Sequence, residues 1–450
     1  NYEQYIFKII IPVFFIFPAS SQEIPSVDSI TEFTDDYFNL EKSIPGSVVV
    51  IVIDGKIIYL GGFGYSNLGM QIPMDPSKTL VPLGSISKLL TAVTVMAFAE
   101  KNSIDLDKDL RSIFDREGID IGSNYPITLS NLLTHSSGIG DRKFGISKFI
   151  GQEKVTDIRG LLKTNPPAQL FPPGTAIVHS DIAFSMAGLA LELLSGENFT
   201  SLSKDLIFSP IGMKNSCFIN KGSLSEQNVL SPNDGHLTDK SCGSLRITNT
   251  YAQDDTSYRF FQQIYGLTVP SSNALSTGED IGKFISTIMQ DRENILKSNS
   301  VINLLSQQAS NYRRMNGVSF GLNEESLSGY KSWSLDSLGP NSSAFIDFIP
   351  ELKLGVFVAG NIINPSGAFN SYQNVSFLNQ FTNELINELW PEPSINEREL
   401  QLLTADDRAD YAAAYVDSRI DYDTPLKLKR LFKQVFVNQI SDVRIFFDGE

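Results

Sequence analysis

The segment Pro-Leu-Gly-Ser-Ile-Ser-Lys-Leu-Leu, residues 82–90, places a lysine three positions after a serine that follows a glycine. Apolar residues continue from it at helical spacing, which predicts a helix over 84–101. Residues three apart on a helix are neighbours, so the amine of Lys88 can reach the hydroxyl of Ser85. Because a hydroxyl becomes a good nucleophile when an adjacent base takes its proton, Ser85 and Lys88 are a candidate nucleophile and base.

The spacing alone is not specific, because Ser-x-x-Lys also occurs at Ser201–Lys204 and Ser328–Lys331. The alternative interpretation of Ser85 is an ordinary N-cap of an amphipathic helix. A helix N-terminus would in either case add partial positive charge and free N–H groups close to the serine. Those groups are what an oxyanion needs. The rest of the chain has to decide between the two interpretations.

The composition is that of a globular protein with a large core. The chain has 450 residues, of which 42% are hydrophobic and 19% charged, enough for one large domain or two of ordinary size. A net charge of −15 without a basic block argues against binding to nucleic acid or to an anionic membrane. With three His and two Cys and no cluster at ligand spacing, we expect no metal site and no cofactor.

The N-terminal residues are typical of a secretory signal peptide over 1–21. Lys8 precedes a short apolar run at 9–17, and small residues follow at 19–21. The run is too short to span a bilayer, although a membrane anchor or a buried strand are alternatives. We therefore expect a secreted or extracytoplasmic protein that contacts a membrane only if this segment stays uncleaved.

Secretion would give two further sets of residues a role. Cys217 and Cys242 could form one disulfide in an oxidising compartment. Glycosylation sequons occur at Asn198, Asn341 and Asn374.

Local patterns predict a mixture of strands and helices. An Asp-Gly turn at 54–55 joins two apolar strands in a hairpin. We expect strands at 47–53, 56–60, 345–349 and 354–358, and helices at 182–195, 279–289 and 378–389. The region up to about residue 40 and residues 216–270 are interpreted as polar and irregular, the latter as a long loop or small insert.

The composition shifts after about residue 390. Residues 399–415 are charged and helix-prone, while 426–429 and 443–447 are typical of short strands. We interpret 391–450 as a linker and the start of a truncated C-terminal domain.

Several short blocks occur in a fixed order: Ile-Pro-Gly at 44–46, Gly-Ser-Ile-Ser-Lys at 84–88, Leu-Leu-Thr-His-Ser-Ser-Gly at 132–138, Pro-Gly-Thr at 173–175 and Pro-Ile-Gly-Met at 210–213. With them the chain resembles the serine β-lactamase-like superfamily of penicillin-binding proteins, class C β-lactamases, D-aminopeptidases and family VIII esterases. The resemblance implies an α+β fold over 22–390, with a central antiparallel sheet flanked by helices and an active site beside a helical subdomain. It also implies that Ser85 is the nucleophile.

The second motif of that family is usually Tyr-x-Asn, and the matching positions here hold His179, Ser180 and Asp181. An imidazole is neutral above about pH 6.5 and can accept a proton, so His179 could serve as the base. The alternative is a residue that has drifted in an inactive site. His135, in a block shared across the family, is interpreted as structural.

The third motif is usually Lys/His-x-Gly, and counting back from Pro350 places it at Leu335-Asp336-Ser337. Leu335 removes the cation that would bind a substrate carboxylate, which disfavours β-lactams and leaves uncharged ester, amide or peptide substrates. Asp181 and Asp336, if both approached Lys88, would keep its amine charged. The oxyanion hole would use the backbone N–H of Ser85 and one from this strand. Trp333 is expected in the core.

Three hypotheses follow. The first is a secreted serine hydrolase that forms an acyl-enzyme at Ser85, with Lys88 and His179 sharing the proton transfers. The second is a pseudoenzyme that keeps the fold as a binding or scaffolding module. The third makes the fold a structural base for the C-terminal region.

Overall fold

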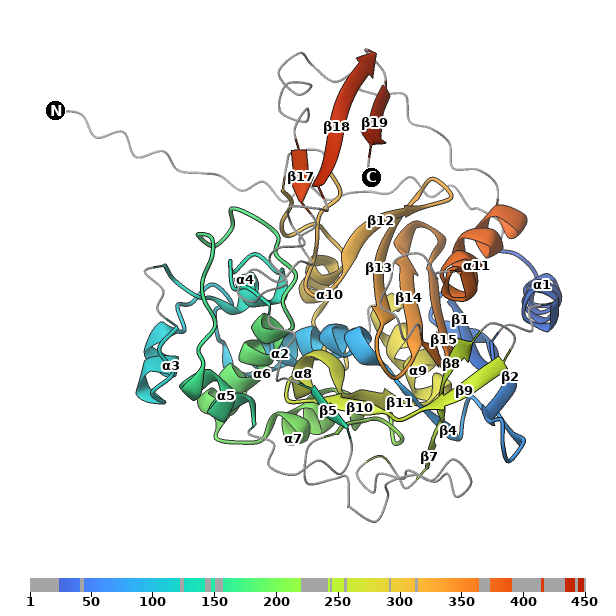
Figure 1. Cartoon of the computed structure of the whole chain (residues 1–450), viewed down its shortest axis with the longest axis horizontal. Coiled ribbons are helices and arrows are strands. Elements are labelled where there is room, and N and C mark those ends of the chain that lie inside the picture. Colours follow the sequence, from blue (N-terminus) through green and yellow to red (C-terminus); the bar gives the residue numbers. More distant parts are fainter. Residues whose placement is uncertain are drawn as a thin grey trace.

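A computed structural model gives the arrangement of most of the chain (Figure 1). It describes residues 24–40, 44–121, 125–141, 157–219, 242, 245–253, 257–290, 293–311, 315–363 and 377–390, and the backbone alone at 147–149, 254, 373–376, 414–416, 434–441 and 444–448. The expected signal peptide and the expected strand at 426–429 lie outside these residues.

An antiparallel sheet of seven strands forms the centre of the described part, in the order β12-β13-β14-β15-β1-β2-β3. The strands are β1 Gly46–Ile53, β2 Lys56–Asn67, β3 Ile72–Pro73, β12 Asn323–Leu327, β13 Tyr330–Leu338, β14 Ser343–Ile349 and β15 Leu354–Gly360. The predicted hairpin at 47–60 and the strands near 345–358 are therefore confirmed. Val50 of β1 lies opposite Phe357 of β15, so chain segments far apart in sequence close the sheet.

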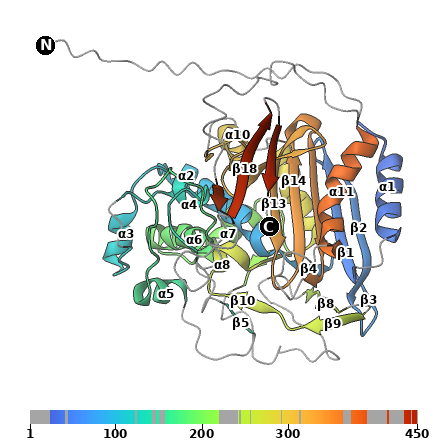
Figure 2. The ribbon, with the colours of Figure 1, turned by 45° about the horizontal axis from the view of Figure 1, so that its top comes forward.

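Side chains of the buried strand β1 alternate between two cores, as the period of two in a strand requires. Val48, Val50 and Val52 join the core shared with α2 (Ser87–Asn102) and α9 (Gly278–Met289). Residues 49, 51 and 53 join a second core under α1 (Val27–Leu40) and α11 (Gln373–Leu389). These two helices lie side by side on one face of the sheet (Figure 2). The fold is α+β, as predicted.

Helix α1 differs from the expected irregular stretch before residue 40. Ile30, Thr34 and Phe38 are its buried residues, and they form a stripe at a spacing of four residues. The intervening residues are mainly polar, so the sequence lacks a strong apolar signal. Packing of that stripe against the sheet and α11 stabilises the helix.

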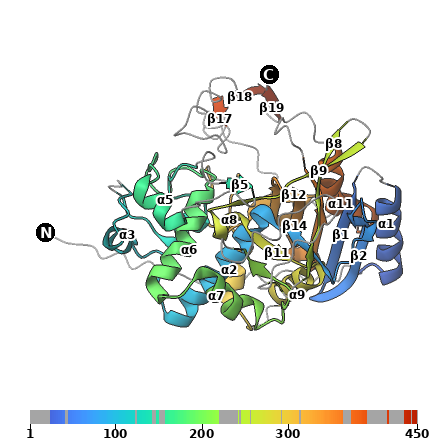
Figure 3. The same ribbon diagram turned by 60° about the horizontal axis from the view of Figure 1, so that its bottom comes forward.

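Further helices lie away from α1 and α11, and α3, α5, α6, α7 and α8 can be seen together in Figure 3. They are α3 Arg111–Arg116, α4 Leu129–Leu133, α5 Ile158–Thr164, α6 Asp181–Ser195, α7 Phe199–Ser203, the π-helical η2 Lys204–Phe208, α8 Val269–Ser272 and α10 Ser298–Leu304. Helix α2 is buried along nearly its whole length and packs against α6 and α8. The predicted end of α6 is confirmed, since Gly196 has a positive φ of 78° and caps it.

Residues 216–270 are not one long loop, because their described part contains short strands. These are β6 Cys217–Phe218, β7 Arg246–Ile247, β8 Thr250–Asp254, β9 Ser257–Phe261 and β10 Ile264–Gly266. They pair with β4 Thr79–Pro82, β5 Ser147–Phe149, β11 Ala274–Ser276 and β16 Ile362–Ile363. Strands of two to five residues show too little alternation to be recognised from sequence.

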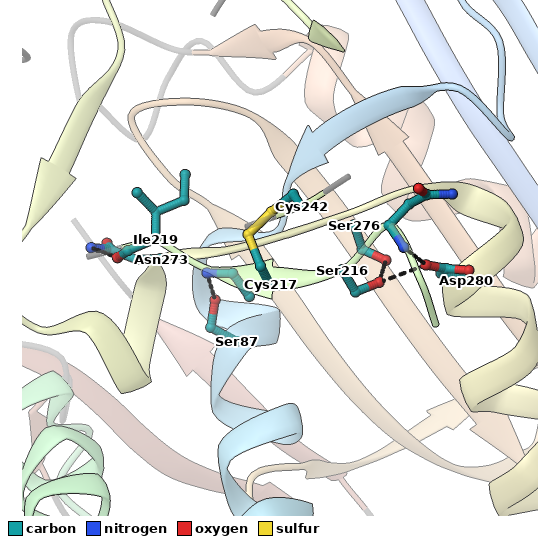
Figure 4. Close-up of a disulfide and its surroundings, with 10 residues drawn as sticks. Ser87, Ser216, Cys217, Ile219, Cys242, Asn273, Ser276 and Asp280 are labelled. Atoms are coloured by element: carbon teal, nitrogen blue, oxygen red, sulfur yellow. Dashed lines mark hydrogen bonds between the residues drawn. A yellow bond between two sulfur atoms is a disulfide. The ribbon is translucent and has the colours of Figure 1, made fainter. Parts of the chain in front are cut away.

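Cys217 and Cys242 form a disulfide (Figure 4). Their Cα atoms are 5.2 Å apart and both side chains are buried. Cys217 lies on β6, which pairs with β11, and the N–H of Ala274 on β11 donates a hydrogen bond of 2.9 Å to Oγ of Ser87. The disulfide therefore fixes the strand that contacts the start of α2.

Near the C-terminus, β17 (Ala414–Val416), β18 (Gln434–Ser441) and β19 (Arg444–Asp448) form a small antiparallel sheet. Strand β19 matches the strand predicted at 443–447, whereas β17 begins inside the stretch expected to be helix-prone. Among the described residues, no helix has the length and apolar character needed to cross a bilayer.

Candidate active site

Ser85 lies in a tight turn between a strand and a long helix. Strand β4 ends at Pro82, and a 3-10 turn, η1 (Gly84–Ile86), leads into α2. Gly84 has a positive φ of 51°, which a residue without a Cβ adopts at little cost. The predicted helix over 84–101 included Ser85. In the structure Ser85 lies in the 3-10 turn that precedes the α-helix. The turn leaves the Ser85 side chain half-buried, beside the N-terminus of α2.

Lys88 is the fully buried partner of Ser85. Its Nζ lies 3.1 Å from Oγ of Ser85 and 3.4 Å from the carbonyl oxygen of Ser271 in α8. It also lies 2.6 Å from Oδ1 of Asp181, and the Lys88 side chain has 0% exposure. Within the described part of the chain, the Lys88 amine therefore has a hydroxyl, a backbone carbonyl and a carboxylate oxygen around it.

Asp181 is held at the start of α6, where a negative charge is stabilised by the helix dipole. Its N–H donates a hydrogen bond of 2.9 Å to Oδ1 of the buried Asp141. Nε2 of His179 lies 3.9 Å from the same Asp181 oxygen that contacts Lys88. The Asp181 carboxylate thus stands between the Lys88 amine and the His179 ring, and it is 29% exposed.

His135 contacts the segment that holds His179, Ser180 and Asp181. Its Nδ1 accepts a hydrogen bond of 3.1 Å from the N–H of Ser180, and its ring centroid lies 4.4 Å from that of His179. Its backbone has a positive φ of 55° and its carbonyl accepts from the N–H of Val178. These contacts fit the structural role predicted for His135.

The third motif lies on β13, with its residues on alternate faces. Oγ of Ser337 accepts a hydrogen bond of 2.9 Å from the N–H of Ser85. Leu335 is buried in the core shared with α2. Asp336 lies opposite Phe345, on the face of the second core, where its charge acts on Asp347. Of the two aspartates expected near Lys88, the structure therefore brings only Asp181 to it.

Comparison with known proteins agrees with this architecture. The β-lactamase family model matches residues 28–374. The chain belongs to the β-lactamase family. The match falls inside the predicted domain at 22–390, whose boundaries remain a prediction.

Individual members of the family are distant. Penicillin-binding protein 4 of Amycolatopsis lactamdurans is 25% identical over 184 residues, 40% of this chain and 46% of that protein. Esterase EstB of Burkholderia gladioli is 26% identical over 192 residues, 40% of this chain and 48% of that protein. The matches thus span about half the length of these curated relatives. The solved D-amino acid amidase of Ochrobactrum anthropi SV3 has a TM-score of 0.64 and 15% identity, covering 80% of this chain and 98% of that one.

The two other Ser-x-x-Lys pairs lack the family geometry. Ser201 and Lys204 are both exposed at the end of α7. Ser328 lies in a turn bonded to Asn383, and the exposed Lys331 forms an ion pair of 2.5 Å with Glu324. Lys331 also lies 5.2 Å from the ring centroid of Trp333, which is buried as predicted. Lys88 is therefore the buried lysine of the three Ser-x-x-Lys pairs, whereas Lys204 and Lys331 are exposed.

The sequons differ in accessibility. Asn198 is exposed at the N-cap of α7, so its glycosylation stays a prediction. Asn341 is buried, and both polar atoms of its amide bond the backbone of Ile264. This burial disfavours a glycan on Asn341, and its glycosylation stays a prediction. Asn374 lies in α11, with its side chain outside the described residues.

Sequence reasoning missed two contributors to the site. The carbonyl of Ser271 accepts a hydrogen bond from Lys88. The carboxylate of Asp141 accepts one from the backbone N–H of Asp181. Neither residue carries a motif that would reveal it. The described residues contain no group of three or more His, Cys, Asp or Glu arranged to hold a metal.

Proposed function

We propose that the protein is a serine hydrolase that cleaves an uncharged ester or amide through an acyl-enzyme at Ser85. The observation that carries the proposal is the distance of 3.1 Å between Oγ of Ser85 and Nζ of the buried Lys88. Nucleophile and base within hydrogen-bonding distance, with the base oriented by a third group, are the signature of covalent catalysis. Asp181 supplies the third group at 2.6 Å.

The reaction requires the neutral amine of Lys88. Its lone pair takes the proton of Ser85 as Oγ attacks the substrate carbonyl carbon, and the carbonyl π electrons move to oxygen. The resulting ammonium returns the proton to the leaving alcohol or amine as that bond breaks. Water then attacks the acyl-enzyme in the same way and releases the acid. The Asp181 carboxylate lies 2.6 Å from the amine and holds it beside Ser85 by charge.

His179 acts on this pair through Asp181. Its ring lies 3.9 Å from the carboxylate oxygen that contacts Lys88, so its charge state changes the field at the amine. The side chain that is hydrogen-bonded to Oγ of Ser85 is that of Lys88, and we therefore assign Lys88 as the base. His179 contributes by modulating it.

The substrate is expected to lack a carboxylate next to the scissile bond. Leu335, at the position where the family has a cation, is buried in the core and brings no charge. A substrate carboxylate beside the carboxylate of Asp181 would be repelled. The esterase among the relatives supports cleavage of an ester.

We further propose that the protein acts outside the cytoplasm. The disulfide between Cys217 and Cys242 is a bond that persists in oxidising compartments, and residues 1–21 have the composition of a signal peptide. Expression of the whole chain in a secreting host, followed by N-terminal sequencing, tests this. A product in the medium that begins near residue 22 is expected. An uncleaved intracellular product would contradict the proposal.

Labelling with a fluorophosphonate, located by mass spectrometry, tests the hydrolase. Label on Ser85 that is lost in Ser85→Ala and retained in Ser201→Ala is expected, since Ser201 has the same spacing to an exposed lysine. A folded protein that takes no label would contradict the hydrolase. The charged pair of Lys88 and Asp181 would then favour the second candidate, a binding module that has lost catalysis.

A further inference from the structure

The side chain of Ser337 occupies the place where a substrate carbonyl oxygen would bind. An oxyanion hole needs donors about 2.7–3.1 Å from the oxygen that becomes charged. Oγ of Ser337 lies 2.9 Å from the N–H of Ser85, which is the donor that the nucleophile itself offers. Two oxygens cannot share that position, because each excludes the other by its van der Waals radius.

We propose that the Ser337 hydroxyl is a built-in occupant of the oxyanion hole, which the substrate must displace before acylation. The proposal rests on the proposed hydrolase function and adds a regulatory residue to it. In the resting state the N–H of Ser85 is satisfied by Ser337. Only a carbonyl that competes with this hydrogen bond gains access to the donor, so the occupant slows acylation and favours strongly polarised carbonyls.

The surroundings of Ser337 are built to hold it there. The residue is fully buried and paired with Ala344 across the sheet, so its backbone is fixed by the ladder of β13 and β14. The hydroxyl of Ser342, at the end of the same hairpin, bonds the carbonyl of Pro82. This bond ties the hairpin to the strand that leads into the Ser85 turn.

Gly84 makes the room that the hydroxyl needs. A Cβ added to Gly84 would overlap Oγ of Ser337. Gly84 also has a positive φ, a backbone conformation that residues with a Cβ rarely adopt. The glycine before the nucleophile and the serine on β13 therefore fit each other.

The test compares Ser337→Gly and Ser337→Ala with the unchanged protein. We would measure the second-order rate of fluorophosphonate labelling at Ser85 and the affinity for phenylboronic acid, whose adduct places an oxygen in the hole. Both variants should label roughly three- to tenfold faster and bind the boronate more tightly by the same factor, the typical worth of one neutral hydrogen bond. Ser334→Ala, on the opposite face of β13, is the matched control and should not change either quantity.

Hydrogen exchange gives a readout that does not depend on activity. In both Ser337 variants the peptide covering residues 82–90 should exchange one amide faster than in the unchanged protein, because Ser85 loses its acceptor. Faster exchange with no labelling of any variant would support the contact and reject the hydrolase. Labelling of the unchanged protein that is equal or faster than that of both variants would overturn the occupant and leave the hydrolase standing. Unchanged exchange in both variants would also overturn the occupant.

Discussion

Replacing Asp181 by Asn should raise the rate of Ser85 labelling at pH 7. The carboxylate lies 2.6 Å from the Lys88 amine and attracts the ammonium form, whereas the proposed reaction needs the amine as a base. With an effective dielectric constant of about 20, Coulomb's law gives roughly 6 kcal/mol for two unit charges at that separation. The partial exposure of Asp181 and the amide oxygen that Asn retains reduce this interaction to about 3 kcal/mol, so we expect a change of roughly a hundredfold in the labelling rate.

The assay is the rate of fluorophosphonate labelling between pH 5 and pH 10 for both proteins, with folding checked by circular dichroism at each pH. Ser85→Ala gives the background, and Lys88→Met should reduce labelling to that background. A labelling rate that Asp181→Asn leaves unchanged would refute the assignment of Lys88 as the base. A rise near pH 6.5 that disappears in His179→Asn would assign the base to His179 instead.

Three further predictions concern stability, each measured by urea unfolding. Gly84→Ala should lower the free energy of unfolding by about 1–2 kcal/mol because of the positive φ, and by more because the new Cβ overlaps Ser337. The loss should therefore be smaller in a Ser337→Gly background, and equal losses in the two backgrounds would contradict the contact. Burial raises the pKa of Asp347, with the charge of Asp336 adding to it, against hydrogen bonds from Thr382 and Ser334. The native state therefore keeps a proton that the unfolded chain releases, so stability should fall by about 1.4 kcal/mol per pH unit between the unfolded pKa and the raised native pKa. Asp347→Asn should remove this slope, and a slope that persists in the variant would contradict the assignment. Cys217→Ser opens a loop of 25 residues and should cost about 3 kcal/mol, whereas an unchanged midpoint would show that the ladder of β6 and β11 suffices.

The surroundings of Lys88 support the proposed chemistry although the resemblance to the family implies Tyr-x-Asn where this chain has His179 and Asp181. The amine is buried, bonded to Ser85 and paired by charge with Asp181. Labelling of Ser85 therefore tests the site directly.

Local signals determined much of the fold. The Asp-Gly turn set the hairpin of β1 and β2, Gly196 set the end of α6, and Thr277 set the start of α9 through a side-chain cap. Such signals act over a few residues and can be found in one sequence. Helix α1 and the short strands within 217–266 were missed, because their stability comes from contacts with distant segments.

The sequence by itself also made the pairing of Ser85 with Lys88 possible, because residues three apart in a helical turn are neighbours. Only the tertiary structure decided which other groups surround them. Asp181 reaches Lys88 because α6 packs on α2, whereas Asp336 faces the opposite side of β13 since neighbouring strand residues point to opposite faces. Ser337 meets the N–H of Ser85 across 252 residues of chain, through the register of β13 in the sheet, which no local pattern encodes.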